Sequence, residues 1–199
     1  ELFSYGPQGL TSYRDALSHQ TQYRYDEAGR QTQVTTPNQE VLNYTYSGAG
    51  DLLSLNHGTG HLTRWDYDVE GRMVTKIDAL NQEILSLGYD ALGRVTSRIN
   101  ALQDVTRYIY DAVGNLKTVD YSDNTGDVTY DYNARHELTS ISDGLGTTTF
   151  SYSPSGLLQS EDGPFASDQV NYQYNAARLR SQLTLVQPGG SWTQQYNYD

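Results

Sequence analysis

His57 and His61 are the residues whose type and spacing come nearest to a metal site, in the segment HGTGH at 57–61. On a helix, two histidines four residues apart would present both imidazoles on one face, as zinc-binding helices do. Two glycines lie between them, and glycine disfavours a helix, so the segment favours a loop. We therefore interpret both as loop histidines and expect neither a metal site nor a cofactor in the chain.

Aspartates that follow a tyrosine and precede a glycine by three residues form a second candidate set, this time for calcium. Calcium takes about six to eight oxygen ligands that converge from one loop. Each Asp-x-x-Gly segment offers one carboxylate, about 21 residues from the next. An aspartate that opens a turn bonds the backbone two residues on, and glycine in the fourth position accepts a positive φ. We therefore predict structural turns at Asp26 and Gly29, Asp68 and Gly71, Asp90 and Gly93, and Asp111 and Gly114.

Signatures of catalysis and nucleotide binding are absent from the sequence. There is no Gly-x-Ser-x-Gly nucleophile turn, no phosphate-binding loop and no dinucleotide fingerprint. The formal net charge of -11 opposes a phosphate-binding surface, and no polybasic segment suits an anionic lipid surface. No stretch approaches the roughly 18 consecutive apolar residues of a spanning helix. We expect a chain that is not an enzyme, binds no nucleic acid and does not span a membrane.

The predicted turns belong to a repeat with a period of about 21 residues. Its marker is a tyrosine directly before the first residue of each turn, and we name these residues the marker tyrosines. They recur at intervals of 20 to 24 residues, with Asp199 after the last, and are Tyr5, Tyr25, Tyr46, Tyr67, Tyr89, Tyr110, Tyr132, Tyr152, Tyr174 and Tyr198. Two residues before most markers lies another aromatic residue. We predict an aromatic ladder made of Tyr23 and Tyr25, Tyr44 and Tyr46, Trp65 and Tyr67, Tyr89, Tyr108 and Tyr110, Tyr130 and Tyr132, Phe150 and Tyr152, and Tyr172 and Tyr174.

Each repeat has the composition of two strands and two turns, because tyrosine, threonine and valine lie between clusters of glycine, asparagine and aspartate. An apolar residue follows the glycine position by five or six places, as Val34 and Ile77 do, which a bulge or a variable strand start would explain. Neighbouring strands rotate by roughly 20–25°, so about 18 strands accumulate a curl. The predicted fold class is all-β, with residues 1–199 as a single array of about nine repeats in a curved or spiralling sheet. We interpret this array as a piece of a longer protein, truncated at both ends.

The aromatic ladder has two interpretations. Flat rings with polar rims suit sugar rings, which would make the chain a carbohydrate-binding or cell-surface-binding module. Alternatively, the ladder holds the sheet together, since cross-strand aromatic pairs contribute roughly 0.2–1 kcal/mol each. The presence of Trp65, Leu87 and Phe150 in place of tyrosine favours packing over a site that depends on hydroxyl groups.

Four segments, YRYDEAGR at 23–30, WDYDVEGR at 65–72, GYDALGR at 88–94 and YIYDAVGN at 108–115, resemble the YD repeats of the Rhs family. That family includes bacterial Rhs and other polymorphic toxins, the B and C components of Tc toxins, and teneurins. The resemblance implies a structural module in the wall of a β-shell that encloses or presents a toxin or another domain.

The same resemblance implies a location and partners. The parent would be a larger bacterial protein that is secreted or lies on the cell surface. Other parts of that protein would be the partners, a C-terminal toxin among them, and glycans would be the partners under the alternative interpretation. The Asp-Pro-x-Gly segment that ends many Rhs cores does not occur in this sequence.

Overall fold

The structure, a computed structural model, describes residues 1–198 and consists of β-strands joined by turns. Within those residues it contains 19 strands and no helix. The all-β fold class is therefore confirmed, with nearly the number of strands that the sequence predicts. Asp199 lies outside the described residues. Across the described part of the chain, no helix has the length and apolar character needed to cross a membrane.

Two compact units divide the chain, one from Glu1 to Gln103 and the other from Asp104 onward. In each unit, strands that follow one another in the sequence pair in antiparallel fashion. The first unit contains β1 (Leu2–Gly6), β2 (Gly9–Arg14), β3 (Gln20–Tyr25), β4 (Gln31–Thr35), β5 (Val41–Tyr46), β6 (Leu52–His57), β7 (His61–Tyr67), β8 (Met73–Ile77), β9 (Glu83–Tyr89) and β10 (Val95–Asn100). The second contains β11 (Val105–Tyr110), β12 (Leu116–Tyr121), β13 (Val128–Tyr132), β14 (Leu138–Asp143), β15 (Gly146–Tyr152), β16 (Leu158–Asp162), β17 (Val170–Tyr174), β18 (Arg180–Gln187) and β19 (Gly190–Gln195).

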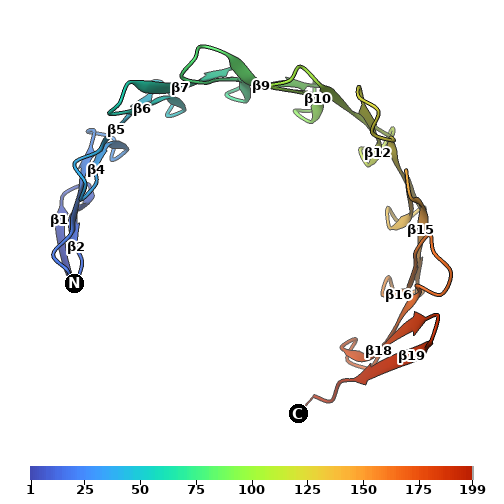
Figure 1. The fold of residues 1–199 in the computed structure, drawn as a ribbon. Coiled ribbons are helices and arrows are strands. Elements are labelled where there is room, and N and C mark those ends of the chain that lie inside the picture. Colours follow the sequence, from blue (N-terminus) through green and yellow to red (C-terminus); the bar gives the residue numbers. More distant parts are fainter. Residues whose placement is uncertain (199) are drawn as a thin grey trace. The chain divides into compact units, whose positions relative to one another are not determined.

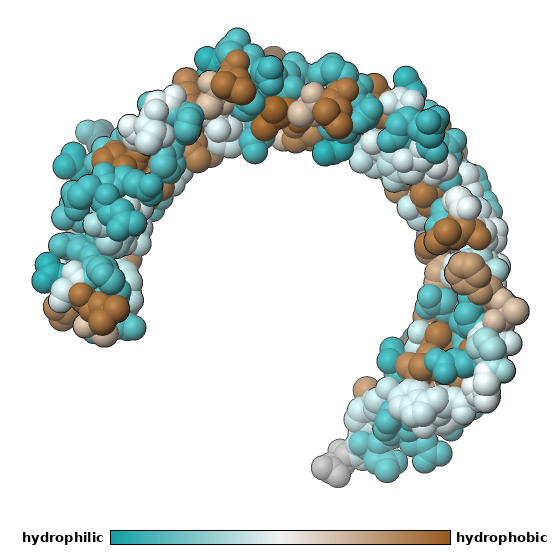
Figure 2. Space-filling model, in the orientation of Figure 1, coloured by the Kyte–Doolittle hydropathy of each residue, from teal (hydrophilic) through white to brown (hydrophobic). Residues whose placement is uncertain are grey.

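Each unit, taken separately, is a single layer of strands that bends as the strands follow one another (Figure 1). Among the described residues, the buried apolar side chains are Val34 and Val119, which are 8% and 6% exposed. They lie directly opposite Tyr23 and Tyr108 on the neighbouring strands. On the face that Figure 2 shows, apolar residues are scattered among hydrophilic ones. A single layer cannot enclose a central core, so contacts between neighbouring strands stabilise the sheet.

A β-bulge lies beside the marker tyrosine in every hairpin that such a tyrosine closes within the described strands. In the hairpin of β3 and β4, Arg24 pairs with Gln33 while Tyr25 pairs with Gln31, so Thr32 is the extra residue. The same one-residue shift occurs beside Tyr5, Tyr46, Tyr67, Tyr89, Tyr110, Tyr132, Tyr152 and Tyr174. A bulge bends its strand and increases the local twist. The repeat therefore places a bend at the same position in every period.

The uneven spacing of the second apolar residue has another cause, since the bulge is constant. Val34 lies opposite Tyr23 and therefore on the ladder face. In the hairpin of β7 and β8, Lys76 takes the place opposite Trp65, and Ile77 lies opposite Arg64. Successive residues of a strand point to opposite faces. Ile77 therefore lies on the face away from the ladder, and a further register shift lies between Lys76 and Ile77 in the pairing of β8 with β9.

Candidate functional site: the turns and tyrosines of the repeat

Asp26 organises the turn that follows β3. The amide nitrogen of Gly29 donates to the carbonyl oxygen of Asp26 at 3.0 Å, and the amide of Asp26 donates to the carbonyl of Arg30 at 2.9 Å. The side-chain Oδ1 of Asp26 accepts from the amides of Ala28 at 3.0 Å and Arg30 at 2.9 Å. Gly29 has φ of 78°, in the left-handed region that side chains disfavour. One carboxylate oxygen thus satisfies two amides of a tight turn.

The other oxygen of Asp26 forms an ion pair. Its Oδ2 accepts from Nε of Arg30 at 2.7 Å. The backbone hydrogen bond from Arg30 lowers the pKa of the Asp26 carboxyl below its ordinary value, and the guanidinium adds to this effect while burial opposes it. Asp68 with Arg72 and Asp90 with Arg94 repeat the ion pair at 2.7 Å, and Asp111 accepts from Nδ2 of Asn115 at 2.8 Å. Each of these carboxylates therefore forms its bonds within its own turn, and the turns are spaced one period apart.

The turn keeps its geometry where the sequence departs from Asp-x-x-Gly. A side-chain oxygen still accepts from the amide four residues on in the turns that begin at Ser47, Asn133, Ser153 and Asn175. His136 and Arg178, which replace glycine, have φ of 61° and 64°. A positive φ is costly for a residue with a Cβ atom. The surrounding hydrogen bonds therefore impose the turn on these two residues.

Seven of the ten marker tyrosines donate a hydrogen bond to the repeat before their own. The hydroxyl of Tyr46 donates to the carbonyl oxygen of Gln31 at 2.8 Å, and the ring is half-buried. Equivalent bonds of 2.7 to 3.0 Å run from Tyr25 to Leu10, Tyr67 to Leu52, Tyr89 to Met73, Tyr132 to Leu116, Tyr174 to Leu158 and Tyr198 to Arg180. In most repeats the acceptor is the first residue of the strand that leaves the preceding turn. The marker tyrosine therefore ties consecutive hairpins together.

The arginine at the end of a turn strengthens the same connection. The guanidinium carbon of Arg30 lies 5.0 Å from the ring centroid of Tyr46, and its Nη1 donates to the carbonyl of Ser47 at 2.9 Å. Arg72 lies 4.7 Å from the ring centroid of Tyr89 and donates to the carbonyl of Asp90 at 3.3 Å. Cation–π contacts at exposed sites contribute about 0.5–1 kcal/mol. We name the combination of turn aspartate, arginine and next marker tyrosine the clasp.

Each ladder pair has an outer member, two residues before the marker, and an inner member, which is the marker tyrosine itself. The outer members lie opposite the strand that leaves the same turn. Tyr23, Tyr44, Tyr108, Tyr130 and Tyr172 lie opposite Val34, Leu55, Val119, Ile141 and Leu183. Trp65 lies opposite Lys76, whose Nζ is 5.7 Å from its ring centroid, and Phe150 lies opposite Glu161. The inner members Tyr110 and Tyr152 end β11 and β15 and are half-buried. Most of these rings cover their neighbours, whereas Tyr172 and Tyr174 also line a shallow cleft with Arg178.

The sequence of this repeat matches the profile of a known family. The profile of the family described as RHS Repeat matches residues 5–41, 89–126 and 111–148. The chain belongs to the RHS-repeat family. No curated protein sequence matches this RHS-repeat chain.

Solved structures similar to the RHS-repeat chain include components of Tc toxins. A crystal structure of TcdB2-TccC3-TEV superposes with a TM-score of 0.69 at 17% identity, over 97% of this chain and 12% of that one. A crystal structure of TcdB2-TccC3 gives a TM-score of 0.67 at 16% identity, over 96% of this chain and 12% of that one. A Tc holotoxin pore from Photorhabdus luminescens gives 0.60 at 17% identity, over 98% and 14%. At such identities the likeness establishes a shared fold, and this chain spans about an eighth of the length of those chains.

The turns that follow the marker tyrosines lie along one edge of the RHS-repeat sheet, which we call the first edge. The opposite, second edge carries turns that do not have the Asp-x-x-Gly pattern. Asp78 accepts from the amides of Leu80 and Gln82 at 2.9 Å each, and Asn81 has φ of 61°. Ser18, Gln39 and Gln103 adopt the same left-handed conformation in the corresponding turns. These are the second turns that the sequence predicts in each repeat. Their signal in the sequence is the aspartate, threonine or asparagine that opens each of them, rather than a glycine.

The arginines of the clasp were missed as functional residues. Arg30, Arg72 and Arg94 all follow the turn glycine directly, and that recurrence was visible in the sequence. What the sequence did not show is the position of the Arg30 and Arg72 guanidinium groups beside the next repeat. Contacts between residues 16 or 17 positions apart, such as Arg30 with Tyr46 and with Ser47, depend on the strand register.

The two histidines of HGTGH are not loop residues, which corrects the sequence interpretation. His57 is the last residue of β6 and His61 the first of β7, and the two are directly paired across the hairpin. Nδ1 of His57 lies 3.4 Å from Oγ1 of Thr59, and Nδ1 of His61 lies 3.1 Å from the same oxygen. Among residues 1–198, no group of three or more histidine, cysteine, aspartate and glutamate side chains is arranged to hold a metal ion.

Proposed function

We propose that this RHS-repeat segment is a structural module in the wall of a β-shell that belongs to a larger secreted or surface-exposed bacterial toxin protein. The shell encloses or presents another part of the same protein, with a C-terminal toxin as its cargo. The module acts by shape and carries out no catalytic step. Its partners are therefore the other segments of the parent protein.

The observation that carries this proposal is the clasp. A bond from Tyr46 to the carbonyl of Gln31 and a bond from Arg30 to the carbonyl of Ser47 link two successive hairpins. The same tyrosine bond recurs at Tyr67 and Tyr89. Because this bond recurs between successive hairpins, the sheet can be extended one hairpin at a time without a central core. The wall of a shell requires a sheet that can be extended in this way.

The likeness to Tc toxin components supports the same proposal. It covers 97% of this chain in the TcdB2-TccC3-TEV structure, so nearly all of the segment has the fold found there. This coverage supports the proposal that the whole segment is one stretch of repeats.

The geometry favours the wall over a carbohydrate-binding surface. A sugar platform would need tyrosine hydroxyls and ring faces that are free to meet a ligand. The hydroxyl of Tyr67 is engaged with the carbonyl of Leu52, and the ring faces of Tyr46 and Tyr89 are covered by Arg30 and Arg72. These three tyrosines thus use their hydroxyls or ring faces within the sheet.

Imaging of the full-length parent protein tests this proposal. We expect electron microscopy to show a closed or spiralling hollow particle whose wall contains this segment, and limited proteolysis to leave the segment downstream of the repeats intact. Replacing Tyr25, Tyr46 and Tyr67 by phenylalanine should open the wall and expose that downstream segment. The matched control is Arg24→Met, because Arg24 is exposed and precedes the marker tyrosine. An extended ribbon with a protease-sensitive downstream segment in the unmodified protein would exclude a shell.

A further inference from the structure

The hairpin of β6 and β7 brings two imidazoles to one point. His57 and His61 are opposite each other in the antiparallel register. Both Nδ1 atoms are directed at Oγ1 of Thr59, at 3.4 and 3.1 Å. Gly58 and Gly60 are the other residues of the connection, and Gly60 has φ of 85°. The apex therefore carries no bulky side chain other than Thr59 to compete for the space between the two rings.

Two imidazole nitrogens that converge on one point form a chelate. Imidazole is a preferred ligand of zinc, nickel and copper ions, and zinc binds histidine nitrogen at about 2.0–2.1 Å. Both nitrogens now lie within hydrogen-bond distance of a single oxygen atom. Small rotations of the two side chains, neither of which is buried, would bring the nitrogens to bonding distance of an ion at that point.

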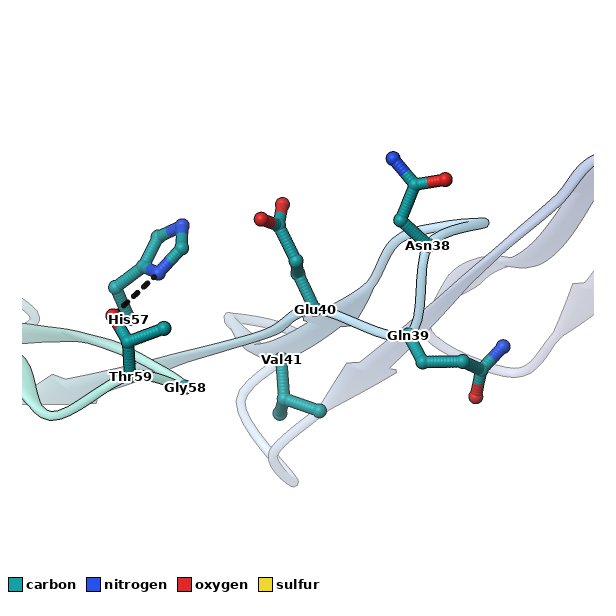
Figure 3. Close-up of a pocket in the computed structure, with 7 residues that line it drawn as sticks. All are labelled: Asn38, Gln39, Glu40, Val41, His57, Gly58 and Thr59. Carbon is teal, nitrogen blue, oxygen red and sulfur yellow. Dashed lines mark hydrogen bonds between the residues drawn. The ribbon is translucent and has the colours of Figure 1, made fainter.

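A carboxylate shares a cleft with His57, one member of the pair. Glu40 and His57 line one open cleft together with Asn38 and Thr59. In the close-up, the side chains of Asn38, Glu40 and His57 extend to the same side of the backbone, whereas Gln39 and Val41 extend to the other side (Figure 3). The negative charge of Glu40 raises the local concentration of cations near the imidazoles.

We propose that His57 and His61 form a two-imidazole chelate for a borderline divalent cation such as Zn²⁺ or Ni²⁺, bound through both Nδ1 atoms with water completing its coordination. The proposal is independent of the wall function. The spacing of four residues that would suit a helix works here because a short hairpin, rather than a helical turn, brings the two residues together. The bound ion would fasten β6 to β7 at the second edge of the sheet.

Proton balance sets the pH dependence of this site. In the free chain, the Thr59 hydroxyl can accept from one Nδ1–H and donate to the other Nδ1. In the bound state both imidazoles are neutral and carry their single proton on Nε2, so one ring shifts its proton from Nδ1 to Nε2 through solvent. The cation and protons compete for the same ring nitrogens, so metal affinity falls as the pH is lowered.

Isothermal titration calorimetry with zinc chloride on the tag-free chain tests the proposal, at one neutral and one mildly acidic pH. We expect one ion per chain at the higher pH and weaker binding at the lower pH. His57→Gln and His61→Gln should each weaken binding by more than roughly the tenfold that loss of an outer-shell partner costs. The matched control is His19→Gln, because His19 is paired with Asp15 at 2.9 Å in another turn.

A second measurement does not depend on variants. Titration of zinc into the unmodified chain, followed by NMR of the imidazole resonances, should perturb His57 and His61 and leave His19 and His136 unchanged. Thr59→Ala should retain binding, because the hydroxyl is not a ligand in this arrangement. The absence of saturable binding, unchanged affinity in both His57→Gln and His61→Gln, or loss of binding in His19→Gln would overturn the proposal.

Discussion

The phenol hydroxyl of Tyr67 donates a 3.0 Å hydrogen bond to the backbone carbonyl oxygen of Leu52, 15 residues earlier in the chain. Leu52 begins β6 and Tyr67 ends β7, so the bond joins the strand that leaves one turn to the tyrosine that precedes the next. Burial of the Tyr67 ring raises the pKa of its phenol above the ordinary value. The hydroxyl therefore stays protonated, and remains a donor, throughout the neutral range.

Replacing Tyr67 by phenylalanine should destabilise the sheet while preserving the packing of the ring. The carbonyl of Leu52 loses its partner, and a typical hydrogen bond contributes about 0.5–1.5 kcal/mol. The free energy of unfolding from urea titration should fall by about that amount. Tyr5→Phe is the control, since Tyr5 is 73% exposed on the first strand. Equal losses in the two variants would contradict a specific role for the bond.

Two glycines of one turn should respond in opposite ways to alanine. Gly50 has φ of 106°, whereas Gly48 lies outside the left-handed region, and a Cβ atom at either position would meet nothing within 4 Å. Gly50→Ala should therefore cost about 1–2 kcal/mol of stability through backbone strain alone. Gly48→Ala should be neutral or stabilise by up to about 1 kcal/mol, because it restricts the unfolded chain. Thermal or urea unfolding of the two variants measures the difference, and similar losses in both would contradict this account of the turn.

Arg30 and Tyr46 should be energetically coupled. A double-mutant cycle with Arg30→Met and Tyr46→Leu should give a coupling free energy of about 0.5–1 kcal/mol, the range of an exposed cation–π contact. Arg30→Met also breaks the ion pair with Asp26, and that loss is common to both arms of the cycle. Replacing Arg24 in a parallel cycle with Tyr46 should give no coupling, since Arg24 points to the opposite face. Additive effects in the first cycle would show that the guanidinium does not hold the tyrosine.

Acid should destabilise the turns that follow the marker tyrosines, such as those opened by Asp26 and Asp90. Backbone hydrogen bonds from Arg30 and Arg94 lower the pKa values of Asp26 and Asp90 in the folded chain. A depressed folded pKa contributes stability that is present above the unfolded value of about 3.9 and is lost as the pH falls through the folded value. The urea midpoint should therefore drop as the pH is lowered below about 4.

The double variant Asp26→Asn with Asp90→Asn tests the source of that acid sensitivity. Asparagine fits the position, because Asn133 and Asn175 already open two turns of the same geometry. The variant should show a shallower loss of stability with falling pH than the unmodified chain, because two of the titrating groups are gone. An identical pH dependence would assign the acid sensitivity to other carboxylates.

Much of the fold could be predicted from the sequence because its determinants are local. The side chain of Asp26 bonds amides two and four residues away, and Gly29 adopts its conformation without reference to distant residues. Such interactions leave a compositional trace at fixed spacing. The period of the marker tyrosines then predicted the number of strands to within one.

The remaining features depend on strand register, which the sequence pattern did not specify. The acceptor of Tyr46 is a backbone carbonyl, and a carbonyl is present at every residue, so no residue type marks Gln31 as the partner. The two glycines of HGTGH disfavour a helix and mark a turn, but residue types do not show that β6 and β7 extend to include both histidines. Ile77 was grouped with Val34 by spacing, although the constant bulge places it on the opposite face.

The connections at the two edges of the sheet differ in their tolerance of length. Tyr25 ends β3 and Gln31, six positions later, begins β4. The next strand also begins six positions after Tyr46, Tyr67, Tyr89, Tyr110, Tyr132, Tyr152 and Tyr174. At the other edge, residues 144–145 suffice between β14 and β15, whereas residues 163–169 separate β16 from β17. Insertions and deletions can therefore accumulate along one margin of the array, whereas from β3 to β18 the connections at the other margin have a single length. New surface loops, epitopes or reporter sequences can be grafted on the tolerant margin with the least effect on the growth of the sheet.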